Sequence, residues 1–433
     1  MSGESSGPRR WFLSRGGAVG GTLLVAGCLS DSDDEGQTDD ADDDGSADDD
    51  DEMDDLLAFP EVEDPPAAVY RPTHREEMLM LEPVEAGEYR FGPMLTYPHP
   101  FWIPEGQGFE RVDVESGEDV HLMVTAWDAE TGIVIPLDTS PLFEIEHEDG
   151  SFSDEERPWL MISQQMGFHF GDNIALEDDG TYRVEGSMQP VDIRKTGAFE
   201  GRLEDPVDFS FEFELGQELR ELPAQIEYFP EEEWGEPGAL EPMDHGDHAG
   251  DEHDDHGHDD HGDDHNHDDH ADGHGDDHDD HGHDDHEDDH ADDHNGHDDH
   301  HVPYSALPPA EDLPGTHQET LESGNALFET TVLEPGSRFV DDDEWYLAVS
   351  PRSPYNRCVL PLMTLEATID GETYSLTETI DDELHHHYGV PLEDDPDGAD
   401  FELEVRTPPQ VSRHQGFETA FVDMEPMSTV ISL

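Results

Sequence analysis

Positive charge is scarce in this sequence. Eighteen Lys and Arg stand against 114 Asp and Glu among 433 residues, and Lys195 is the only lysine. The resulting net charge of −96 excludes nucleic acid as a partner, because phosphate would be repelled at every approach. Residues 31–55 hold 16 of the acids and residues 244–301 hold 26, but the 320 residues outside these runs and the first 30 still sum to −56. Strong ionic screening relieves such self-repulsion, so the composition predicts a protein of a halophilic archaeon.

Cysteine and long apolar runs are also scarce. Arg9 and Arg10 form a twin-arginine pattern, and the apolar stretch 16–27 that follows is too short to span a membrane. It ends at Leu-Val-Ala-Gly-Cys28, which resembles a lipobox, so we predict a signal segment at 1–28 and a lipid on Cys28. The protein would then be extracytoplasmic, anchored to the outer face of the cytoplasmic membrane; an uncleaved N-terminal anchor would give the same topology. The other cysteine, Cys358, is expected to be a buried small apolar residue.

Several catalytic motifs are absent. The sequence contains no GxSxG, no phosphate-binding loop and no HExxH, and it offers no plausible cysteine nucleophile. A blue-copper site needs a thiolate, and no cysteine lies near a histidine in either half. We therefore expect neither an enzyme nor an electron-transfer protein of the cupredoxin type.

Short strand-like segments separated by turns are abundant, and no long run of helical period occurs. This pattern predicts an all-β protein with two β-sandwich domains, at 58–235 and 303–433. Residues 29–57 are expected to be a disordered acidic tether, and 236–302 a disordered His/Asp-rich linker. In the first domain the expected strands include 120–125, 134–137, 142–145, 182–185 and 209–213.

The two predicted domains look like copies of each other. His169-Phe170-Gly171 is echoed by His387-Tyr388-Gly389, and four further short matches keep the same order. Five ordered matches favour a duplicated sandwich. The other four pairs of segments are 135–137 with 360–362, 148–150 with 369–371, 176–179 with 392–395, and 197–200 with 416–418.

The segment 161–174, Met-Ile-Ser-Gln-Gln-Met-Gly-Phe-His-Phe-Gly-Asp-Asn-Ile, resembles periplasmic iron-transport and copper-binding proteins of the P19/Tp34 type. The strand 180–184, Pro190 and the Lys-Thr-Gly at 195–197 follow in that family's order. The resemblance implies immunoglobulin-like sandwiches and a metal site to which a Met and a following His contribute. In the family a further His stands just upstream of the Thr-Gly, whereas this chain has Val191, Asp192 and Arg194 there.

The side chains themselves also point to metal. Thioether beside imidazole is a soft pair suited to copper, so Met161 or Met166 with His169 is a candidate site. His385 and His387 alternate on an expected strand next to acidic residues, a combination that suits zinc, copper or iron. The plainer alternative is that the methionines fill a core and His169 is a satisfied buried histidine.

The strongest signal is the His/Asp tract at 244–301, with 19 His, 24 Asp and 2 Glu in 58 residues. Imidazole and carboxylate groups spaced along a flexible chain can converge on one cation, and both are ligands for zinc, copper or nickel. An acidic halophilic linker would explain the Asp but not the His. The tract resembles the His-rich insertions of zinc-importer binding proteins in composition only. Its candidate ligands include His258, His261, His281, His283, His300 and His301.

The function predicted from the sequence is therefore an exported, lipid-anchored protein that binds a divalent transition metal. Zinc or copper fits best, with iron or nickel as further candidates, and a membrane importer is an expected partner. The alternative is a non-enzymatic surface interaction protein in which the tract is only a halophilic linker.

Overall fold

The computed structural model describes residues 59–105, 108–243, 301–340 and 343–433. Almost every regular element in these ranges is a β-strand, which confirms the predicted all-β class. The helical elements are short: α2 (Gln217–Glu221) and the 3₁₀ turns η1 (Gly197–Phe199), η2 (Leu222–Gln225), η3 (Glu231–Glu233) and η4 (Ala310–Asp312). Within the described part of the chain, no helix has the length and apolar character needed to cross a membrane.

The first sandwich packs a large sheet against a smaller one. The smaller sheet has the order β14-β12-β8-β9, formed by β8 (Leu142–His147), β9 (Ser153–Glu156), β12 (Gly180–Met188) and β14 (Val207–Leu215). The larger sheet has the order β2-β4-β7-β11-β10-β25-β5-β6, with β3 also on β4. Its strands are β2 (Leu79–Met80), β3 (Val84–Ala86), β4 (Tyr89–Thr96), β5 (Phe101–Glu105), β6 (Gly108–Val112), β7 (Glu118–Asp128), β10 (Trp159–Ser163), β11 (Gly167–Ala175) and β25 (Ser412–Arg413).

The second sandwich has the same two-layer plan. Its larger sheet has the order β13-β22-β23-β19-β18-β16, with β17 also on β18, and its smaller sheet the order β21-β20-β24-β26. The strands are β13 (Arg194–Lys195), β16 (Thr316–His317), β17 (Leu321–Ser323), β18 (Ala326–Leu333), β19 (Trp345–Arg352), β20 (Thr364–Ile369), β21 (Glu372–Ser375), β22 (Thr377–Asp381), β23 (His385–Leu392), β24 (Asp400–Thr407) and β26 (Met427–Val430). A separate pair joins β1 (His74–Arg75) to β15 (Glu227–Tyr228).

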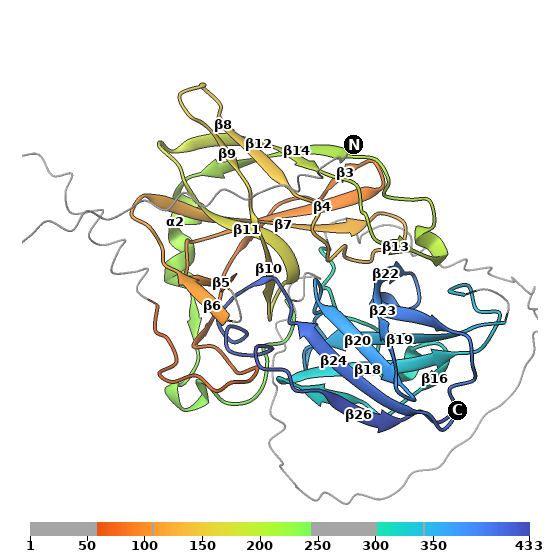
Figure 1. Cartoon of the computed structure of the whole chain (residues 1–433). Helices are drawn as coiled ribbons and strands as arrows, with labels where there is room; N and C mark the ends of the chain where they lie inside the picture. The colour runs from red at the N-terminus through yellow and green to blue at the C-terminus, as the bar shows by residue number, and fades with distance from the viewer. Residues whose placement is uncertain (1–58, 106–107, 244–300, 341–342) are drawn as a thin grey trace, which may run out of the picture. The chain divides into compact units, whose positions relative to one another are not determined.

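Each larger sheet contains one short strand from the other half of the sequence. The strand β13 lies next to β22 (Figure 1) and pairs with it in parallel, and β25 pairs in parallel with β10. All the other pairs among the described strands are antiparallel. The two exchanged strands tie the halves of the sequence together, and the boundaries at 58–235 and 303–433 stay a prediction.

Alternating side chains build the core between the layers. The strand β14 buries every second residue, as the run 209–213 predicted, and Phe209 stacks on Phe91 of β4 with ring centroids 3.8 Å apart. The segments 120–125, 142–145 and 182–185 lie within β7, β8 and β12, so those strand predictions are confirmed as well. The segment 134–137 makes only one isolated bridge, from Val134 to Trp127, because Pro136 has no N–H to give to a ladder.

Candidate metal centre

The hairpin of β10 and β11 brings two predicted ligands together. Met161 and His169 face each other in the register of the two strands, and both side chains are fully buried. The turn between the strands ends at Gly167, whose φ of +71° is a backbone conformation that glycine adopts without strain. Met166 lies in this turn, buried and packed in the core of the sandwich. That these residues bind metal stays a prediction. The structure shows that other side chains able to bind metal lie near Met161 and His169.

Three more histidines surround this hairpin. His99 lies between β4 and β5, His121 lies on β7, and His414 directly follows β25. One ring nitrogen from each of His99, His121 and His414 can be chosen so that all three lie within 4.8 Å of one another. His414 comes from the other half of the sequence, and its backbone N–H donates to the carbonyl of Ile162 at 3.2 Å. The exchanged strand β25 therefore supplies a histidine to the first sandwich.

All four imidazoles are oriented in the same way. The Nδ1 atom of His121 lies 2.8 Å from Asn173 Oδ1, and that of His169 lies 3.1 Å from the Gly167 carbonyl. The Nδ1 atom of His99 lies 3.1 Å from the Pro100 carbonyl, and that of His414 lies 3.3 Å from Glu76 Oε1. Because carbonyl, amide and carboxylate oxygens only accept, each Nδ1 carries the proton and each Nε2 presents a lone pair.

Among the described residues, these Nε2 atoms meet no hydrogen-bond donor from outside the group. The Nε2 atoms of His99 and His121 are buried and have no hydrogen-bond partner in that part of the chain. Those of His169 and His414 lie 3.2 Å apart. Two ligand nitrogens at 2.0–2.1 Å from a tetrahedral ion are separated by about 3.3 Å, so this spacing suits a shared cation. Oxygen acceptors that orient metal-binding histidines through the other ring nitrogen are the usual outer shell of such sites.

The position of Gly171 keeps the space beside the ligands open. A Cβ atom there would lie 3.0 Å from His121 Nε2, 3.2 Å from Met161 Sδ and 3.4 Å from His169 Cδ2. The thioether sulfur and two of the imidazoles therefore border the same point. The glycine of the His-Phe-Gly motif is explained by this convergence rather than by a turn, since it lies within β11.

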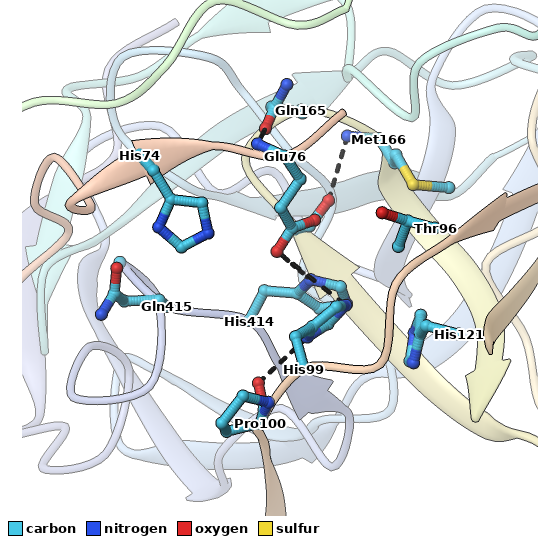
Figure 2. Close-up of polar contacts among 12 residues, drawn as sticks. His74, Glu76, Thr96, His99, Pro100, His121, Gln165, Met166, His414 and Gln415 are labelled. Atoms are coloured by element: carbon cyan, nitrogen blue, oxygen red, sulfur yellow. Dashed lines mark hydrogen bonds and ion pairs between the residues drawn. The ribbon is translucent and has the colours of Figure 1, made fainter. Parts of the chain in front are cut away.

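The carboxylate of Glu76 closes one side of the centre. Figure 2 shows it directed at the rings of His99 and His414; its Oε1 lies 3.9 Å from His99 Nε2 and 3.3 Å from His414 Nδ1. Burial alone would raise the pKa of Glu76, but electrostatic interactions with the His99 and His414 rings and the hydrogen bond from His414 outweigh it and hold this pKa well below its usual value. A small cleft lined by His74, Glu76 and His414 lies on this side.

Burial also sets the protonation of the imidazoles. It lowers the pKa of His169 to about 3 and that of His99 to about 4, in each case together with repulsion by His414. The pKa of His121 is lowered well below its usual value by burial and by the neighbouring His99. These rings are therefore neutral near pH 7, which is the state that binds a metal ion.

The predicted pair His385 and His387 lies in different surroundings. His387 is buried, its Nδ1 faces the His385 carbonyl at 3.0 Å, and its Nε2 lies 3.2 Å from the hydroxyl of Tyr346. His385 instead lines a cleft together with His386. The strand does not simply alternate here, because His385 has a φ of +55°.

Of the remaining predicted ligands, His301 is exposed. Cys28, His258, His261, His281, His283 and His300 lie outside the described residues. Sequence reasoning missed His99, His121, His414 and Glu76. One signal could have pointed to His414. The match of 197–200 with 416–418 aligns Gly416 with Gly197, so His414 lies just upstream of the segment that corresponds to the family's Thr-Gly, where the additional histidine was expected.

Comparisons with known proteins give a fold-level likeness. A family described as a domain of unknown function, DUF7350, matches residues 311–430. No curated protein matches the chain. Among solved structures, a copper-bound variant of FetP from uropathogenic Escherichia coli strain F11 is 23% identical, with a TM-score of 0.26, and the match covers 33% of this chain and 99% of that one. A copper-bound variant of Campylobacter jejuni P19 is 16% identical, with a TM-score of 0.25 and coverage of 32% and 96%.

Proteins of the P19 type are thus among the structures to which this chain is similar, as the segment 161–174 predicted. At identities below 25% and TM-scores below 0.5, this likeness carries no conclusion about what the chain binds. The chemistry of the centre therefore rests on its own side chains.

Proposed function

We propose that this protein is an exported copper-binding protein whose ion is held by His99, His121, His169 and His414. The observation that carries the proposal is the convergence of four buried Nε2 lone pairs whose Nδ1 protons all point at oxygen acceptors. Burying several imidazole acceptors without donors is unfavourable for folding alone, so a bound cation is the simplest reason for the arrangement.

The thioether favours copper over zinc. Sulfur of a methionine is a soft ligand that copper accepts in either oxidation state, whereas zinc sites rarely use it. Met161 Sδ lies beside His121 Nε2 at the open side of Gly171, so it is placed to join the imidazoles. Glu76 adds a negative charge that offsets part of the charge of the ion.

The tract at 244–301 would collect metal and pass it to this centre. Two contacts support this step: Leu240 N–H donates to Gln164 Oε1 at 2.7 Å, and Met243 N–H donates to the Gln165 carbonyl at 2.9 Å. Leu240 and Gln165 also line the small cleft that reaches Glu76 and His414. Met243, the last described residue before the tract, is therefore held next to Gln165 of this cleft, and a tract tethered there would present its metal to the centre at a high effective concentration.

Export and anchoring complete the proposal. The twin-arginine segment and Cys28 would place the protein at the outer face of the cytoplasmic membrane of a halophile, where it would deliver copper to a membrane importer. Replacing Cys28 by Ser tests the anchor: the protein should appear in the medium or keep its signal segment. A Cys28→Ser protein that is cleaved and still fractionates with membranes would contradict lipid anchoring.

Copper binding is tested by competition with chelators of known affinity for copper(I), copper(II) and zinc. The Met161→Leu protein, nearly isosteric, should lose copper(I) affinity by on the order of tenfold and keep most of its zinc affinity, because only the soft ion prefers sulfur. His317→Ala changes an exposed histidine of β16 that is paired with Glu329, and it is the control. Equal losses for both metals would show that Met161 serves packing rather than binding.

A further inference from the structure

The lining of a second cleft includes none of the ligands proposed for the copper centre. The loop 131–136 forms one wall and the segment 304–307 another, and Asp382, His385 and His386 complete the lining. Its volume of about 340 Å³ leaves room for an ion with several waters. Neither the proposed function nor the Met-His motif involves this cleft.

His386 contributes an unused acceptor to it. Its side chain is only 1% exposed, and its Nε2 lies 2.8 Å from Glu378 Oε1. The Glu378 oxygen also accepts from the Tyr388 hydroxyl and the Leu362 N–H, both at 3.3 Å. Since the carboxylate accepts the Nε2 proton, Nδ1 presents a lone pair, and that atom is buried without a hydrogen-bond partner among the residues that the structure describes.

The first sandwich shows that the fold does not need this polar group. In the register of the two hairpins, His386, Glu378 and Tyr388 occupy the positions held by Phe168, Leu160 and Phe170. There the same inner face is fully apolar, and both phenylalanines are completely buried. Replacing an apolar trio by a buried carboxylate, imidazole and phenol disfavours folding unless the group has another use.

The backbone conformation of His385 is a second observation that points to a binding site. It takes the position of Gly167 in the first hairpin and keeps the same left-handed backbone, with a φ of +55° against +71°. A histidine is strained where a glycine would be relaxed, and such strain gathers at binding sites. His385 lines the same cleft as His386, together with Ala306.

We propose that His385 and the Nδ1 atom of His386 bind a second divalent cation of borderline softness, with Zn²⁺ as the fitting example. The pair Glu378–His386 has the carboxylate–histidine arrangement that orients ligands of zinc. Asp382 also lines the cleft, but its Oδ1 already accepts from the Ala198 N–H at 2.8 Å and from Arg338 Nη2 at 3.2 Å, so it is not counted as a ligand. Without sulfur the site favours zinc over copper(I), and waters complete the coordination.

This site is more open than the copper centre. Among the described residues, only His99, His121 and His414 form a group of three with all ligand atoms within 4.8 Å. Two imidazoles and water give weaker binding than four imidazoles, so zinc in the cleft should exchange readily.

Carbethoxylation of the full-length protein, read by peptide mass spectrometry, tests the proposal. Diethyl pyrocarbonate acylates neutral imidazole, and excess Zn²⁺ should slow the reaction at His385 while leaving His317 unchanged. In His386→Gln, whose amide can still donate to Glu378, the protection should disappear. Glu378→Gln should weaken it, with zinc affinity reduced on the order of tenfold. No protection in the natural protein, or full protection in His386→Gln, would overturn the proposal.

Anomalous diffraction at the zinc edge gives a reading that needs no variant. Crystals of the natural chain soaked in Zn²⁺ should show a peak between His385 and His386. A peak at the copper centre without one in the cleft would overturn the proposal. A cleft peak held by residues of a neighbouring molecule would show an adventitious ion only, with the same consequence.

Discussion

The hairpins β10–β11 and β22–β23 share one scaffold and differ in the side chains around it. In both, a histidine turns its Nδ1 to the carbonyl two residues earlier, His169 to Gly167 and His387 to His385. The Nε2 atom of His169 lies 3.2 Å from that of His414, whereas the Nε2 atom of His387 lies 3.2 Å from the Tyr346 hydroxyl. One scaffold thus gives either a set of converging lone pairs or a hydrogen bond that leaves the histidine satisfied.

The strand register shows which residues differ between equivalent positions of the two hairpins. Thr379 stands opposite His387 where Met161 stands opposite His169, and Tyr346 takes the place of His121. A Cβ on Gly389 would collide with the Tyr346 hydroxyl, so the tyrosine fills the space that Gly171 keeps open. The second hairpin has kept the histidine and the glycine of the motif but lost the other ligands.

The largest expected effect is the difference in copper affinity between the His169→Ala and His387→Ala proteins. His169→Ala should lower copper affinity by more than about 100-fold, because even outer-shell changes reduce metal affinity about 10–100-fold. His387→Ala should leave the tight copper equivalent in place. Competition with a chelator of known affinity measures both. Equal losses in the two variants would show that the hairpins do not differ in function.

The tract and the folded part should differ in capacity and affinity. Deleting 244–301 is expected to remove most bound equivalents of zinc or copper, because the tract holds 19 of the 29 histidines. One or two tight sites should remain, since ligands fixed on strands are preorganised. Elemental analysis and calorimetry before and after deletion measure this. A deletion protein that binds nothing would make the tract the whole of the metal function.

The two regions should also release metal at different pH. Imidazoles with an unperturbed pKa of about 6.5 become protonated below ~pH 6, so the tract should lose metal there. The lowered pKa values of His169, about 3, and His99, about 4, mean that protons compete with metal at the centre only at lower pH. Stepwise acidification with metal readout should therefore show two phases. A single release near pH 6 would contradict the buried centre.

The smallest effects concern the two glycines. Gly171→Ala should weaken copper binding with little change in thermal stability, since its Cβ would press on His121 Nε2 and Met161 Sδ by only a few tenths of an ångström. Gly389→Ala should leave copper binding unchanged but destabilise the fold by about 1–3 kcal/mol, because Tyr346 is packed against it. Thermal unfolding and chelator competition on both proteins separate these outcomes.

The two hairpins, β10–β11 and β22–β23, show which features could be predicted from the sequence. Local patterns sufficed for the strands and for bringing Met161 and His169 together on one hairpin, because these residues are close in sequence; that the two bind metal stays a prediction. The alternation of β14 and the matched His-x-Gly segments are likewise local. His385 and His387 could not be separated in this way, because the left-handed backbone at His385 breaks the alternation on which the reasoning relied.

The sequence by itself determined the charge, the all-β class, the two related halves and a soft Met-His pair. Only the tertiary structure decided which histidines join that pair. His99, His121 and His414 are separated by up to 315 residues, and spacing along a chain says nothing about which strands will lie side by side. The parallel pairing of β25 with β10 brings His414 to the centre, because a strand from one half completes the sheet of the other.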